Sequence, residues 1–211
     1  MSWNSYINSH KGISPLQSQD VDDTVFFSAR NHFLEGLNTR LRAVWDDVSE
    51  FVRAANIAIQ CRLKIDSDLY HEIMISIHYR LVNLHFEIGD MNETIRLGLL
   101  AFVSAGFLQW RGVETRYEHL VQRLEAVLSF FGHESRATPT QHTVWLYITI
   151  AISTLPENDR IYFKPAMTRA LSSIKIKLWN EAKQLLKSVI WLDHIFDPSA
   201  RQLVEGILNS V

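Results

Sequence analysis

The stretch that decides the fold is LHFEIGDMNETIRLGLLAFVSAGFLQWRG, which runs from Leu84 to Gly112. It holds a short polar turn at Glu87–Asp90 and then a run without charge from Leu97 to Trp110. This run is shorter than the roughly 20 residues that a membrane span needs, and it suits a helix that is buried on all sides. The sequence therefore predicts a central buried helix here, entered through the turn and capped by Asn92.

The composition indicates a globular protein that does not bind polyanions. The 211 residues are 47% apolar and 21% charged, with a net charge of −2, so nothing in the balance favours nucleic acid or an anionic membrane. Basic residues gather only between Asp159 and Lys187, where we expect a solvated face. Cys61 is the only cysteine, which excludes a disulfide within the chain and a cysteine-built zinc site. A soluble, intracellular protein is expected.

Apolar residues recur at three- and four-residue steps along most of the chain, as they do in amphipathic helices. Asp66 or Ser67 is expected to cap one helix, Thr115 and Glu118 to form a capping box with Gly132 as the stop, and Asp197–Pro198 to open the last helix. Pro165 suits a first helical turn. The apolar stripes are Leu41–Ile59, Leu69–Leu84, Leu120–Phe131, Val144–Leu155, Trp179–Ile190 and Leu203–Leu208.

The stretch Val144–Leu155 is rich in β-branched residues and could form a strand on propensity alone. A strand needs a partner, and no other stretch reads as one, so we predict a buried helix. The predicted fold is all-α, an irregular bundle of about eight helices. Residues 1–20 are expected to form a flexible polar tail, and residues 21–211 a single helical domain in which 21–38 is an ambiguous helix.

Two patterns invite a chemical interpretation. His71, His78 and His85 are seven residues apart, which on a helix separates neighbours by about 10.5 Å, too far to share a metal ion. Asp46, Asp47 and Glu50 match the acidic motif of helical terpene cyclases, but the second metal motif of those enzymes is missing. With no nucleophile beside a base and no phosphate loop, we predict no catalytic, cofactor-binding or metal-binding residue, and no enzyme.

Three segments in order carry a family resemblance. The first is Leu69–Gly112, where LYHEIMISIHYRLVNLHF leads through EIGDMNETIRLGLL to FLQWRG. The last is Trp179–Ile207, WNEAKQLLKSVIWLDHIFDPSARQLVEGI, and between them lies HTVWLYITIAIS, residues 142–153. Together they resemble the C-terminal regulatory region of fungal binuclear zinc-cluster transcription factors (the fungal-specific transcription factor domain), over about the last two-thirds of the chain.

The resemblance implies a regulatory helical domain that works in the nucleus. Its partners would be proteins, by homo- or hetero-association with related regulators, with a small effector in a helical cavity as a further ligand. The family binds DNA through six cysteines that hold two zinc ions, whereas this chain has Cys61 alone. We therefore expect no direct contact with nucleic acid, none with a membrane and no cofactor.

The family's regulatory region is typically longer than this chain, so the domain is expected to be an incomplete or truncated copy of it. An alternative is a helical interaction module that acts on a full-length relative, because a partial domain leaves apolar helix faces uncovered. An enzyme of the terpene-cyclase type is the remote third alternative.

Overall fold

The computed structural model describes residues 35–108, 118–134, 140–154 and 163–210. Within these ranges the chain forms eight α-helices and a π-helical turn, and no strand, which confirms the all-α prediction. The elements are α3 (Thr39–Gln60), α4 (Ser67–Asn83), α5 (Met91–Val103), the π-helical η1 (Ser104–Leu108), α6 (Glu118–Glu134), α7 (Gln141–Ser153), α8 (Lys164–Ser173), α9 (Trp179–Val189) and α10 (Asp193–Leu208).

Helix α5 is the centre of the packing, as the charge-free block predicts. It contacts α3, α4, α6 and α7, and Leu97, Leu99 and Phe102 are fully buried. The approach to α7 is close: a Cβ atom on Gly98 would lie 2.4 Å from the Cδ1 atom of Leu146. A side chain at this position would require the Leu146 side chain to move or the two helices to separate.

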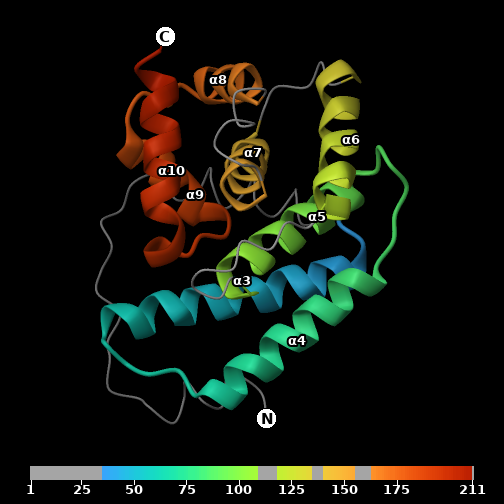
Figure 1. Cartoon of the computed structure of the whole chain (residues 1–211), viewed down its shortest axis with the longest axis vertical. Helices are drawn as coiled ribbons and strands as arrows, with labels where there is room; N and C mark the ends of the chain where they lie inside the picture. Colours follow the sequence, from blue (N-terminus) through green and yellow to red (C-terminus); the bar gives the residue numbers. More distant parts are fainter. Residues whose placement is uncertain (1–34, 109–117, 135–139, 155–162, 211) are drawn as a thin grey trace.

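The β-branched stretch around Trp145 is helical, since it forms α7. This helix contacts α5, α8, α9 and α10, so it is covered on several sides (Figure 1). The Trp145 indole is fully buried, meets the Trp45 ring of α3 at 5.6 Å, and donates its Nε1–H to the Ile190 carbonyl at 2.6 Å. A helix satisfies its own backbone groups, so burial on several sides favours it over an unpaired strand.

Helices α3 and α4 lie side by side and form one end of the molecule in Figure 1. The apolar stripe from Leu41 to Ile59 faces the core over most of its length. Asp66 caps α4 as predicted, since its side chain accepts from the N–H groups of Asp68 and Leu69 at 3.0 Å. Helix α8 begins with Pro165 in its first turn, which is also as predicted.

The predicted cap of α5 was wrong. Asp90, not Asn92, caps the helix, because its carboxylate accepts the Asn92 N–H at 2.8 Å. The Asn92 side chain is used elsewhere: its Oδ1 accepts the backbone N–H of Asn38 at 2.7 Å and so joins the start of α3 to the start of α5. Two polar residues near a helix start are both competent caps, and the contact with α3 decides between them.

Two other predicted helix boundaries were wrong. Gly132 does not stop α6, which continues to Glu134. Asp197–Pro198 does not open the last helix, which begins at Asp193 and contains Pro198. Asp197 is instead an acceptor for tertiary contacts, described below. The predicted capping box at Thr115 and the predicted tail at residues 1–20 lie outside the described residues, as does the ambiguous helix up to residue 34.

Candidate functional site

The spaced histidines lie on or just after α4 and do not converge. His71 is exposed, and its Nδ1–H donates to the Ser67 carbonyl at 2.7 Å. His78 is half-buried, and its Nδ1–H donates to the Met74 carbonyl at 2.8 Å. Burial lowers the pKa of His78 and outweighs the opposing effect of this hydrogen bond. His71 and His78 thus each donate to a carbonyl of α4 itself, four residues earlier in the chain.

The acidic triplet on α3 does not form a metal site. Asp46 and Asp47 are exposed, and Asp47 pairs with Arg80 of α4 at 2.6 Å. Across the described ranges, no group of three or more His, Cys, Asp or Glu side chains is placed to hold a metal ion. In the same ranges, no helix is both long and apolar enough to cross a membrane.

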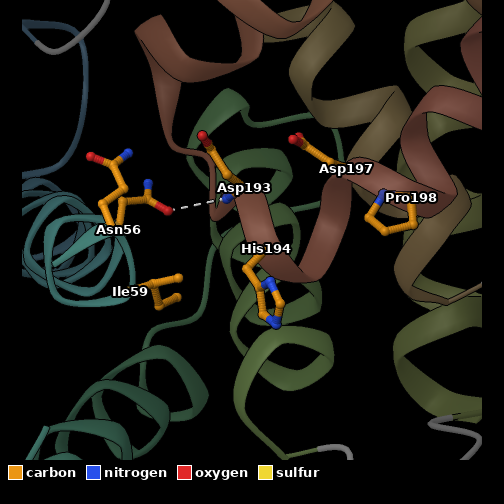
Figure 2. A pocket seen from close by; sticks show the side chains of 7 residues that line it. Asn56, Ile59, Asp193, His194, Asp197 and Pro198 are labelled. Carbon is orange, nitrogen blue, oxygen red and sulfur yellow. Dashed lines mark hydrogen bonds between the residues drawn. The ribbon is translucent and has the colours of Figure 1, made fainter. Parts of the chain in front are cut away.

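The candidate site is a recess between the last turns of α3 and the first turns of α10 (Figure 2). It has a volume of about 340 Å³ and is open to solvent. The end of α3 contributes side-chain amides to its walls, the start of α10 contributes carboxylates, and Ile59 and Pro198 are its two apolar side chains. The lining residues are Asn56, Ile59, Gln60, Asp193, His194, Asp197 and Pro198.

Asn56 holds the two walls of the recess together. Its Nδ2 donates to the Trp191 carbonyl at 2.8 Å, and its Oδ1 accepts the Asp193 N–H at 3.1 Å (Figure 2). The amide thereby pairs with two backbone groups just before and at the start of α10. Because Leu192 gives that helix no side-chain cap, this contact from α3 supplies an acceptor for one of its first N–H groups.

The two carboxylates of the recess are already matched by two lysines of α9. Lys183 lies 2.5 Å from Asp197 and 3.8 Å from Asp193, and Lys187 lies 2.8 Å from Asp193. The Trp191 indole N–H also donates to Asp197 at 2.9 Å. The hydrogen bond to Asp197 is the largest of the effects that raise the pKa of Lys183. The wall is therefore polar and close to charge-neutral.

The side chains of the recess are suited to binding a ligand, and they do not include a nucleophile paired with a base. The Asp193 and His194 side chains point in opposite directions from the start of α10, as expected for neighbours in sequence (Figure 2). Oδ1 of Asp193 is enclosed and receives no hydrogen bond from the described residues.

A second polar cluster, which the sequence did not predict, lies inside the protein. Glu93 of α5 is fully buried and accepts from Arg96 at 2.7 and 2.9 Å and from Arg123 of α6 at 2.5 Å. Arg96 also donates to the Leu81 carbonyl of α4 at 2.9 Å. Burial raises the pKa of Glu93, but the two guanidinium groups outweigh it and leave this pKa below its ordinary value.

The Glu93 carboxylate joins α5 to α6, and the Arg96 guanidinium joins α5 to α4. The signal that could have revealed it is an acid and a base three residues apart, directly before the charge-free run of α5. Neither residue reaches the recess, so the cluster is a structural element of the core.

In the comparisons with known proteins, no family model, no curated protein and no solved structure matches this chain.

Proposed function

We propose that this chain is a regulatory, non-DNA-binding helical domain related to the C-terminal regulatory region of fungal zinc-cluster transcription factors. It works in the nucleus, through protein contacts and through a small effector that binds the recess between α3 and α10. The ordered set of three similar segments carries this proposal.

The packing of these segments supports the proposal. They correspond to α4–α5, α7 and α9–α10, and α7 contacts both of the others. The contacts meet at Trp145, which packs against Phe102 of the first segment at 6.1 Å and donates to Ile190 at the end of α9. Segments that pack on one shared core are expected to be retained together in descent of a helical body, since core packing restricts their buried positions together.

A reporter assay tests the regulatory role. The chain is fused to a zinc-cluster DNA-binding module, and its output is compared with that of the module alone. We expect the fusion to change reporter expression several-fold, and a Trp145→Ala variant, which disrupts the shared core, to lose the effect. The same output from the fusion and from the module alone would contradict a regulatory function.

A gel-shift assay tests the absence of DNA binding separately. The purified chain, with a net charge of −2, is expected to leave DNA fragments unshifted at about 0.15 M salt, because it offers no net positive charge to replace counterions. Tight, sequence-specific binding under these conditions would refute this part of the proposal and leave the regulatory part to the reporter assay.

A further inference from the structure

Helix α6 is attached to the other described helices along one side. It stands at the edge of the molecule in Figure 1, and α5 is the described element that it contacts extensively. Its buried residues Leu120, Leu124 and Val127 follow one another at steps of four and three, as they do on one face of a helix. Helix α7, by contrast, packs against α5, α8, α9 and α10. Among the described elements, α6 is therefore held mainly by a single neighbour, and α7 by several.

The polar link between α6 and α5 is an ion pair with one exposed end. Arg123 of α6 donates to the Glu93 carboxylate of α5 at 2.5 Å. The Glu93 side chain is fully buried, whereas the Arg123 side chain is 44% exposed. Because its guanidinium reaches the carboxylate from the surface side, Arg123 can pass from Glu93 to water without crossing the core.

The Glu93 carboxylate keeps a partner when Arg123 leaves. Both of its oxygens accept from Arg96 of the same helix, Oε2 from Nε at 2.7 Å and Oε1 from a terminal nitrogen at 2.9 Å. Arg96 is held in turn by the Leu81 carbonyl of α4 at 2.9 Å. A buried charge that loses its only partner is strongly destabilising. The departure of α6 does not incur this penalty, because Arg96 still neutralises Glu93.

We propose that α6 is a latch: it undocks from α5 as a separate unit while the other described helices stay folded. Proteins open in such units where few buried apolar contacts cross a joint. Undocking brings to solvent the Glu93–Arg96 pair and the side of α5 on which α6 packs, and docking covers both again. The inference rests on the joint between α5 and α6 and does not require the regulatory function proposed above.

The groups that receive the latch stay in position while it is open. Arg96 binds Glu93 from the same helix and Leu81 from α4, and neither contact involves α6. The carboxylate is therefore preorganised for the return of Arg123. The docked and undocked states differ in one ion pair and in the burial of one apolar helix face, so a change at Arg123 should shift the balance between them.

Hydrogen exchange of the whole chain, followed by mass spectrometry, measures the opening of each helix. Peptides from 118–134 report on α6, and peptides from 141–153 report on α7. We expect the slowest amides of α6 to exchange at least about 100-fold faster than those of α7, since local openings require less free energy than global ones. In about 0.5 M urea, exchange in α7 should accelerate about tenfold and exchange in α6 much less, because undocking exposes less surface than unfolding.

One variant in α7 separates a local opening from a global one. Trp145→Phe removes the hydrogen bond to Ile190, which the undocking of α6 leaves intact. It should therefore speed exchange in α7 at least about fivefold and leave exchange in α6 within about twofold of wild type. Val204→Ala, which removes buried methyl groups from α10, gives the same comparison if Trp145→Phe does not fold.

A second pair of variants tests the contact that closes the latch. Arg123→Met removes the ion pair and should speed exchange in α6 about fivefold. Gln122→Met changes the exposed neighbouring residue of the same helix and is the matched control, which should leave exchange in α6 unchanged. Circular dichroism verifies that all variants remain folded.

Three results would each overturn the proposal. The first is equal protection of α6 and α7. The second is a Trp145→Phe protein in which exchange speeds up as much in α6 as in α7, because α6 would then open only with the whole protein. The third is an exchange rate in α6 that Arg123→Met leaves unchanged or that Gln122→Met changes equally, because the pair with Glu93 would then not hold α6 in place.

Discussion

Replacing Glu93 with glutamine tests the most buried charge among the described residues. The side chain is isosteric, so its volume in the core is unchanged, but it has no negative charge and only one acceptor oxygen. Arg96, which is 6% exposed, would then be left as a buried cation without a full counter-charge. At least one of the three hydrogen bonds that the carboxylate accepts from Arg96 and Arg123 must also be lost.

The expected cost follows from burial. Removing one partner of a buried ion pair destabilises a protein by about 3–5 kcal/mol. Because the glutamine oxygen still accepts hydrogen bonds from these arginines, we expect a loss at the lower end of this range, about 3 kcal/mol, from the free energy of unfolding. Arg123 is 44% exposed, and its removal leaves the pair between Glu93 and Arg96 intact. Arg123→Met should therefore cost only about 1 kcal/mol.

Urea denaturation followed by circular dichroism measures both losses. With a denaturant slope of about 3 kcal/mol/M for a domain of this size, Glu93→Gln should lower the midpoint by about 1 M, and Arg123→Met by about 0.3 M. If Arg123→Met lowered the midpoint as much as Glu93→Gln, the reasoning would be refuted, because the exposed partner would then carry the whole interaction.

The pH dependence of the same pair of proteins gives a second measurement. The folded-state pKa of Glu93 lies below its ordinary value, so its stabilisation is complete above the unfolded-state pKa, about 4.3, and is lost as the pH falls through the folded-state pKa. The difference between wild type and Glu93→Gln should thus be constant from pH 6 to 8 and shrink below about pH 4. A difference that grew in acid would contradict the assigned sign.

Two further substitutions test the packing of α7. Gly98→Ala should destabilise the protein by about 1–3 kcal/mol, because the new Cβ atom meets Leu146 at 2.4 Å. Gly206→Ala, whose Cβ atom meets nothing within 4 Å, should be neutral or stabilising. Thermal unfolding compares the two variants, and equal effects would count against a tight contact at Gly98. Trp145→Phe should cost at least about 1–2 kcal/mol in urea denaturation, since the buried Ile190 carbonyl loses its donor; an unchanged midpoint would show that this hydrogen bond contributes nothing.

Much of the local structure could be read from the sequence because it depends on neighbours along the chain. Asp66 caps α4 through N–H groups two and three residues away. The charge-free residues of α5 form a helix because of their own propensity and periodicity, and their lack of charge predicts that this helix is buried. The cap of α5, by contrast, depends on a distant contact. Asn92 does not cap this helix because its Oδ1 accepts the N–H of Asn38 at the start of α3.

The sequence by itself determined that this chain is helical and which faces of its helices are apolar, because helical periodicity and side-chain polarity are local properties. Tertiary structure alone decided where α10 begins and where a ligand could bind. Asn56 and Asp193 are 137 positions apart, and only folding brings their hydrogen-bonding groups to 3.1 Å. Among the described residues, tertiary packing also decided which apolar side of α4 is buried, since this helix carries apolar residues on two sides and α3 and α5 cover one of them.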